Sequence, residues 1–148
     1  MWKLNANERL NRWREFRKQI AELPFEERLI PIVDFWLSCP FIPYYLDPTL
    51  PDSWPDPWVL IEENCYCDLA KCLGIVYTLY LTSHQPQLEI RQYNDKEANI
   101  LYNLVWVDQG KYVLNLEHDS VVNKKHIQSS FRLQKKITIT DLKLEQIQ

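Results

Sequence analysis

Two cysteines lie close together in the stretch Glu63-Asn64-Cys65-Tyr66-Cys67-Asp68-Leu69-Ala70, at the predicted start of a long apolar helix. The positive end of a helix dipole stabilises a thiolate, and a thiolate is the nucleophile of cysteine hydrolases and acyl transferases. Cys67 and Cys65 are therefore candidate nucleophiles. The competing interpretation is that they are small buried hydrophobic residues, as free cysteines usually are.

A cysteine enzyme also needs a base, which is usually a histidine held by a carboxylate or an amide. The sequence has three histidines, and none of them falls on a predicted strand. His118 is the best of the three because Asp119 follows it directly. A thiol enzyme would therefore use Cys67 or Cys65 together with His118 and Asp119.

Other kinds of site fit the sequence less well. The spacing C-x-C-x4-C of Cys65, Cys67 and Cys72 is not a zinc-binding pattern, and no second pair of ligands completes it, so we expect no metal. The two glycines, Gly74 and Gly110, cannot form a GxGxxG or a GxxxxGKS/T loop, which excludes those two kinds of nucleotide-binding enzyme. No pair of carboxylates stands out as a glycosidase pair, and we expect no cofactor.

The composition fits one folded domain. The 148 residues are 46% hydrophobic and 25% charged, which excludes a disordered tail. No apolar run reaches about 18 residues, so we expect no membrane contact. No apolar leader segment follows Met1-Trp2-Lys3, so we expect an unsecreted chain whose thiols are reduced. The net charge of −3 makes nucleic acid an unlikely partner. Residues 122–148 carry six basic and two acidic side chains, which form either a solvated face or a docking segment for an acidic or phosphate-bearing surface.

Helices are predicted at the beginning of the chain. Asn5 and Glu8 have the spacing of a capping box, and the helix that they start ends at Pro24. A second helix over 25–37 contains Pro31, so it is either kinked or starts late.

The middle of the chain is rich in proline. Residues 39–57 hold six prolines in 19 residues, which predicts an extended segment pinned by aromatic side chains, either covering the core or forming the wall of a groove. Asp56 and Pro57 suit the cap and the first position of a short helix. A longer helix over 67–82 is apolar nearly all round, so it is expected at the centre, with Gly74 marking a close approach by another element.

Alternating strands follow. The stretches 87–93, 99–107 and 111–117 alternate, and a turn over 108–111 joins the last two, with Gly110 available for a positive φ. Residues 135–144 alternate again and are expected to form an edge strand or an arm. This order predicts an α+β fold, in which N-terminal helices and a buried central helix pack on a small antiparallel sheet. The chain is then one domain over 1–148. It has a helical part at 1–38, an extended segment at 39–57, a helix-plus-sheet core at 58–118 and a basic C-terminal arm at 119–148.

The stretches SWPDPWVLIEENCYCDLAKCLG and LYNLVWVDQGKYVLNLE resemble the transglutaminase-like branch of the papain-like cysteine hydrolases, over roughly residues 52–117. The resemblance implies a cysteine at the start of a buried helix, with a histidine and an aspartate on the two strands. Anchored on Ala70, it puts the nucleophile position at Tyr66, and a slip of one residue would restore a thiol. It puts the histidine position at Asn103 or Leu104 and the aspartate position at Asn115. The resemblance thus implies a scaffold without its catalytic residues.

The whole chain also resembles a small protein family of T4-like tailed phages, especially those of cyanobacteria. NANERLNRWREFRKQI, SWPDPWVLIEENCYCDLAKCLG, YNLVWVDQGKYVLN and VVNKK carry this resemblance. It implies a phage virion or host-cytoplasm location. We expect a non-enzymatic structural or assembly protein that contacts other virion proteins. The alternatives are a cysteine hydrolase or acyl transferase, and an early phage protein that binds a host enzyme.

A docking role needs surface residues. The aromatic pair Trp54 and Trp58 flanks Pro-Asp-Pro and is a candidate for ligand contact, with core packing as the alternative. The alternating C-terminal segment could add a strand to a neighbouring sheet. Its candidate contact residues are Lys135, Lys136, Ile137 and Ile139.

Overall fold

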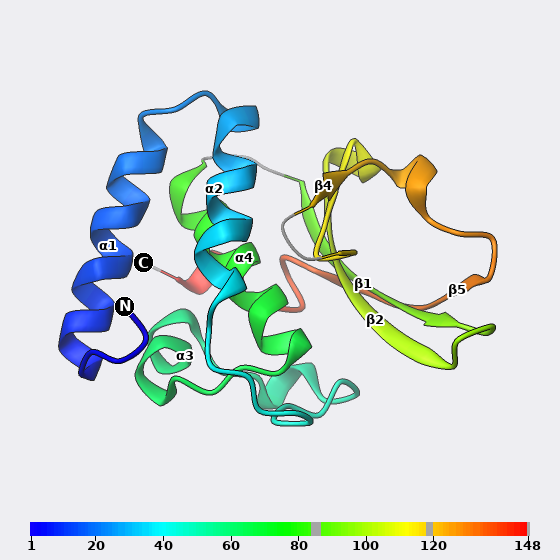
Figure 1. Ribbon diagram of the computed structural model, residues 1–148, viewed down its shortest axis with the longest axis horizontal. Helices are drawn as coiled ribbons and strands as arrows, with labels where there is room; N and C mark the ends of the chain where they lie inside the picture. The colour runs from blue at the N-terminus through cyan, green and yellow to red at the C-terminus, as the bar shows by residue number, and fades with distance from the viewer. Residues whose placement is uncertain (84–86, 118–119, 148) are drawn as a thin grey trace.

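The computed structural model describes residues 1–83, 87–117 and 120–147, and it shows helices on one face of an antiparallel sheet (Figure 1). The described helices are α1 (Ala6–Ala21), α2 (Phe25–Leu37), α3 (Pro57–Glu63) and α4 (Asp68–Thr82). The sheet has the order β4-β3-β2-β1-β5. Its strands are β1 (Leu88–Asp95), β2 (Ile100–Val107), β3 (Tyr112–Leu114), β4 (Val121–Val122) and β5 (Phe131–Thr138). The predicted α+β fold is therefore confirmed.

Local signals set the beginnings of the helices. The Asn5 side chain accepts from the backbone N–H of Glu8 at 3.0 Å, and the Glu8 side chain accepts from the N–H of Asn5, which completes the predicted capping box. Asp56 caps α3 through the N–H of Val59 at 2.9 Å. The helix α2 runs from Phe25 through Pro31 without a late start.

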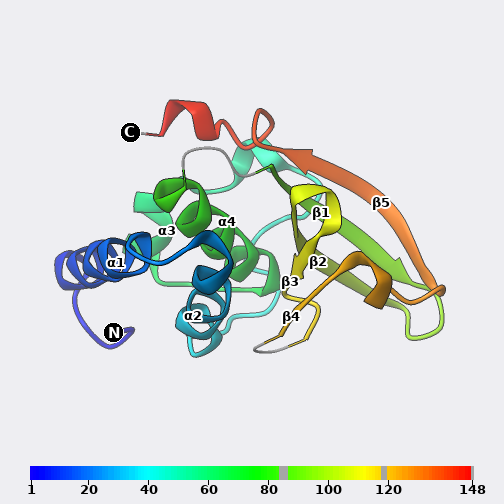
Figure 2. The ribbon, with the colours of Figure 1, turned by 90° about the horizontal axis from the view of Figure 1, so that it is seen from above.

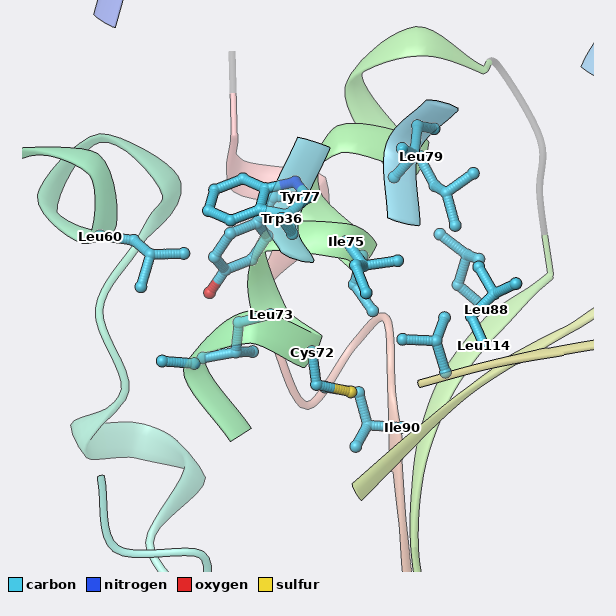
Figure 3. Packing of buried hydrophobic residues seen from close by; sticks show 14 of the residues in the cluster. Trp36, Leu60, Cys72, Leu73, Ile75, Tyr77, Leu79, Leu88, Ile90 and Leu114 are labelled. Atoms are coloured by element: carbon cyan, nitrogen blue, oxygen red, sulfur yellow. The ribbon is translucent and has the colours of Figure 1, made fainter. Parts of the chain in front are cut away.

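The central helix α4 lies between the other helices and the sheet, and its apolar residues form the main core (Figure 3). Cys72 is fully buried and points from α4 toward Ile90 of β1 (Figure 3). Gly74 lies against the ring of Trp36 on α2, because a Cβ at this position would be 2.6 Å from Cε3 of that ring. The close approach predicted at Gly74 is therefore a contact between α2 and α4.

Three buried polar groups meet inside this core. The indole nitrogens of Trp13 and Trp36 both donate to Oγ1 of Thr78, at 3.0 and 3.1 Å. The Thr78 hydroxyl donates in turn to the carbonyl of Gly74 at 2.7 Å. One hydroxyl on α4 therefore fixes a tryptophan from α1 and a tryptophan from α2.

The sheet carries a second, smaller core on the face away from the helices. Its buried members are Tyr93, Leu104, Trp106, Val113 and Phe131. The turn beside it, over Asp108–Gly110, has the expected positive φ at Gly110, at 89°. This turn therefore joins β2 to β3 as the sequence predicts.

The C-terminal segment differs from its predicted form. The strand β5 starts at Phe131 and pairs with β1 inside the same chain. It ends at Thr138, because the Asp141 carboxylate accepts from the backbone N–H and the hydroxyl of Thr138, at 2.9 and 3.0 Å. The predicted edge strand is therefore confirmed, since β5 is the outermost strand, but it does not continue to residue 144. The chain turns instead into the short 3-10 helix η4 (Leu144–Gln146), whose Leu144 is fully buried.

The segment η4 crosses the helical layer. Figure 2 shows it beside α3 and α4, on the opposite side of α4 from α2. No described helix is both long enough and apolar enough to cross a membrane.

The proline-rich segment over 39–57 is held at fewer points than predicted. Trp54 is buried and its indole N–H donates to the carbonyl of Asp47 at 2.8 Å. Phe41 and Tyr44 are instead exposed, at 68% and 96%. Their aromatic rings therefore do not pin the segment, and they lie free on the surface.

Arg9 joins the N-terminal helix to the end of α3. It is 8% exposed, and its guanidinium donates to the carbonyls of Ile61 and Glu62 at 3.0 and 2.9 Å, as well as to that of Leu4. Carbonyls in the last turn of a helix have no partner within the helix. The arginine side chain therefore satisfies the end of α3.

Arg9→Met is expected to lower the free energy of unfolding by about 2–4 kcal/mol, because it leaves these carbonyls without their charged donor. Urea denaturation measures the change. Arg12→Met, at an exposed position of the same helix, is the matched control and should change it by less than about 0.5 kcal/mol. Equal effects of the two variants would contradict a special role for Arg9.

Candidate active site

The expected active-site region lies where the N-terminus of α4 faces the strands β2 and β3. Cys67 is the N-cap residue of α4, and Asp68 is its first helical residue. Asn103 lies on β2, and Asn115 follows the last residue of β3 with a φ of 72°. Elements separated in sequence therefore bring one carboxylate and two amides to one place.

Hydrogen bonds join these three side chains. The Nδ2 atoms of Asn103 and Asn115 lie 3.3 and 3.1 Å from the two carboxylate oxygens of Asp68. Asn115 also donates to the backbone carbonyl of Asn103 at 2.8 Å. Gln92 of β1 donates to Oδ1 of Asn103 and to the carbonyl of Pro48, at 3.1 Å each. We call Asp68, Asn103, Asn115 and Gln92 the amide network.

Tyr66 does not belong to this network, although the resemblance puts the nucleophile position there. Its side chain is fully buried, and its ring lies 5.2 and 5.6 Å from the rings of Trp2 and Trp36. Its hydroxyl donates to the carbonyl of Leu60 at 3.1 Å, and burial raises its pKa. The side chain that faces Asn103 and Asn115 is that of Asp68, two residues further on.

The candidate nucleophiles are poorly accessible. Cys67 is 6% exposed, and the half-buried Cys65 donates its S–H to the carbonyl of Glu63 at 3.3 Å. Burial raises the pKa of Cys39 to about 11 and also raises that of Cys72. A raised pKa keeps a thiol protonated at neutral pH, so these two cysteines are inert there.

The predicted base does not fall in the described part of the chain. His84, His118 and Asp119 lie outside the described residues. His126 is described, and its Nδ1 lies 3.3 Å from Oδ1 of Asn123 in an exposed turn. Among the described residues, no group of three or more histidines, cysteines, aspartates or glutamates is arranged to hold a metal ion.

Two hollows flank the start of α4 and share Asp68 and Lys71. One, of about 400 Å³, is lined on its sheet side by Ile100, Leu101 and Asn115, among others. The other, of about 270 Å³, is lined by Leu37, Cys39, Phe41 and Cys67 as well as the shared pair. Exposed apolar side chains, including those of Phe41 and Ile100, therefore border the amide network on both sides.

The comparison with solved structures decides the fold. Legionella pneumophila LapG, a transglutaminase-like cysteine protease, matches with a TM-score of 0.70 and 15% identity, over 88% of this chain and 75% of that one. Calcium-bound LapG matches with a TM-score of 0.71 and 14% identity, over 90% and 76% of the two chains. EGTA-treated LapG matches with a TM-score of 0.70 and 14% identity, over 90% and 74%.

The chain has a transglutaminase-like fold. No family model matches the sequence, and no curated protein matches it either. The transglutaminase-like fold predicted from the two sequence stretches is thus confirmed.

Some of the residues predicted to contact a partner are buried in the core, and others lie on the surface. Ile137 is fully buried and Ile139 packs against the main core, whereas Lys135 and Lys136 are exposed on β5. Lysines on the outermost strand of a sheet discourage pairing with another chain, and a β-bulge in β1–β5 pairing adds to this effect. Trp54 and Trp58 both line a third hollow, of about 390 Å³, together with Tyr77 of α4.

Sequence reasoning did not find the role of Asp68 or Gln92. Asp68 stands at the first position of a helix, where an acidic residue is ordinary. The alternation of Leu88 and Ile90 puts Gln92 on the same buried face of β1, where a polar side chain needs a partner, and the structure leaves it 5% exposed.

Proposed function

We propose that this chain is a transglutaminase-like domain that acts by binding a partner protein and that it performs no thiol chemistry. The observation that carries the proposal is the amide network. Its amides have no lone pair that accepts a proton at neutral pH, so they cannot serve as a general base. Asn103 and Asn115 hydrogen-bond to Asp68, and Gln92 hydrogen-bonds to Asn103, at the place where an enzyme of this fold needs a thiol and an imidazole.

The hollows beside the network support the binding role. Exposed Leu37 and Phe41 line the hollow of about 270 Å³, and exposed Ile100 and Leu101 line the hollow of about 400 Å³. Apolar side chains grouped around a hollow are typical of surfaces that bind polypeptides. The partner in this proposal is a virion or assembly protein of a T4-like phage, which rests on the sequence resemblance alone. Mass spectrometry of purified particles tests it, since an early protein that binds a host enzyme would be absent from them.

Alkylation by iodoacetamide across pH 5–9 tests the absence of thiol chemistry. We expect no cysteine with a reaction midpoint below about 8, because burial raises the pKa of Cys39 and Cys72 and an ordinary thiol titrates near 8.5. Peptide mass spectrometry assigns the reaction to each cysteine. The unfolded chain in urea is the control, in which all four cysteines should react alike.

One observation favours a second candidate, a cysteine hydrolase or acyl transferase. Cys67 is the N-cap of α4 and lines the hollow of about 270 Å³ next to Lys71. A midpoint well below 8 at Cys67 or Cys65 that His118→Gln abolishes would establish this candidate and refute the proposed function.

A further inference from the structure

The third hollow is lined by residues of the stretch 51–58, of α4 and of the C-terminal segment. Figure 2 shows that this C-terminal segment lies on the other side of α4 from α2. The volume of this pocket is about 390 Å³, which is within the usual size of small-ligand sites. The rings of Trp54, Trp58 and Tyr77 line it. It shares no lining residue with the amide network, so it is a separate site.

The aromatic lining is held in place. The indole of Trp54 donates to the carbonyl of Asp47 at 2.8 Å, and the hydroxyl of Tyr77 donates to the carbonyl of Pro55 at 2.7 Å. Trp58 packs edge-on against Trp13 with ring centroids 5.7 Å apart. The pocket therefore exists before any ligand arrives.

The charges around the pocket are mostly negative. Asp52, Asp56 and Asp141 line it, against the single cation of Lys143. Carboxylates repel anionic ligands and attract cations, and aromatic rings attract cations as well. The lining thus selects for positive charge.

Two cations of the chain itself contact residues of this lining, Lys143 from within the pocket and Arg17 from outside it. The Lys143 ammonium is 3.8 Å from a carboxylate oxygen of Asp52. The Arg17 guanidinium lies 5.6 Å from the centroid of the Trp58 ring. The Lys143 contact shows that the carboxylate part of the pocket accepts a positive group, and the Arg17 contact shows that the Trp58 ring accepts one outside the pocket.

We infer that this pocket binds an alkylammonium group, with the carboxylate of Asp52 pairing with the charge and the tryptophan rings covering the alkyl chain. The group belongs either to a free polyamine or to a lysine side chain of a partner. Lys143 competes with the ligand for Asp52, since both carry the same charge. The inference does not depend on the proposed function of the amide network.

Calorimetric titration of the full chain with spermidine and with the peptide acetyl-Gly-Lys-Gly-amide tests the inference. We expect a Kd of about 1 mM or tighter at low salt for at least one probe, weakening as ionic strength rises from about 0.01 M to 0.15 M. Tighter binding of spermidine would indicate a free polyamine as the ligand, and tighter binding of the peptide would indicate a lysine side chain of a partner. The neutral analogue 1,8-octanediol should not bind.

Two variants should change the affinity in opposite directions. Asp52→Asn is expected to weaken binding about two- to fivefold, and Lys143→Gln is expected to strengthen it by a similar factor, because it removes the internal competitor. Both side chains are exposed, so neither change disturbs the core. Asp34→Asn, which removes the same charge at an exposed position of α2, is the matched control and should bind like the native chain.

No binding of either probe at 10 mM, equal binding of octanediol, or weaker binding by Lys143→Gln would each overturn the inference. An unchanged affinity in Asp52→Asn would overturn it as well. All these outcomes are independent of cysteine alkylation, which tests the proposed function.

Discussion

Thr78→Val is expected to lower the free energy of unfolding by about 3–5 kcal/mol. Valine has nearly the shape of threonine but offers no oxygen, so the indole N–H groups of Trp13 and Trp36 lose the acceptor that both use. Each buried donor left without a partner costs about 1–3 kcal/mol. The midpoint of urea unfolding should fall, with an unchanged slope.

Two controls isolate the hydroxyl as the cause. Thr78→Ser keeps the oxygen and removes one methyl group, so it should cost only about 1 kcal/mol. Thr82→Val removes a half-buried hydroxyl on the same helix that donates to the carbonyl of Thr78 at 2.7 Å, and it should cost less than about 1.5 kcal/mol. Similar losses in Thr78→Val and Thr78→Ser would mean that the two indoles do not depend on this oxygen.

The double variant Asp68→Cys/Asn103→His is expected to gain a thiol whose alkylation midpoint lies below about 6, at least two units below that of an ordinary cysteine. Position 68 is the first residue of the 15-residue helix α4, where the helix dipole favours a thiolate. The present side chains at 68 and 103 are 3.3 Å apart, which is within reach of a thiolate–imidazolium pair.

The rest of the amide network would support the new pair. Gln92 already contacts the side chain at 103 with its amide, at 3.1 Å, and an amide is one of the groups that orient a catalytic imidazole. Iodoacetamide reaction from pH 4 to 9, read by peptide mass spectrometry, gives the midpoint for residue 68.

Asp68→Cys alone is the matched control for this design. It keeps Asn103, so its thiol has the helix dipole without an imidazole, and its midpoint should stay between about 7 and 8.5. A folded double variant with the same midpoint as the single variant would show that positions 68 and 103 do not form the geometry of a cysteine-enzyme site.

The sequence predicted those parts of the fold that depend on neighbours in the chain. The capping box of Asn5 and Glu8 and the Asp56-Pro57 start of α3 are signals within four residues, and each begins a helix in the structure. The end of β5 depends on an equally local contact, which the alternation pattern concealed. The Asp141 side chain ends the strand at Thr138, and polar–apolar alternation continues past that point without marking it.

The candidate site also has features that the sequence predicted and features that it did not. The resemblance put the histidine position at Asn103 or Leu104 and the aspartate position at Asn115, and the structure brings Asn103 and Asn115 together while Leu104 lies in the second core. The resemblance could not show that Tyr66 turns toward Trp2 and Trp36 while Asp68 turns toward the sheet. That choice depends on the packing of Trp2 from the N-terminal segment and Trp36 from α2 against the Tyr66 ring, which no local pattern encodes.

The amide network also constrains how this sequence can change over evolutionary time. A histidine at 103 alone would lose the hydrogen bonds to Asp68 and Gln92, and a cysteine at 68 alone would leave two buried asparagines short of an acceptor. Each first step toward thiol chemistry therefore costs stability and yields no nucleophile–base pair. A sequence that changes one residue at a time therefore passes through a less stable intermediate before residues 68 and 103 can form such a pair.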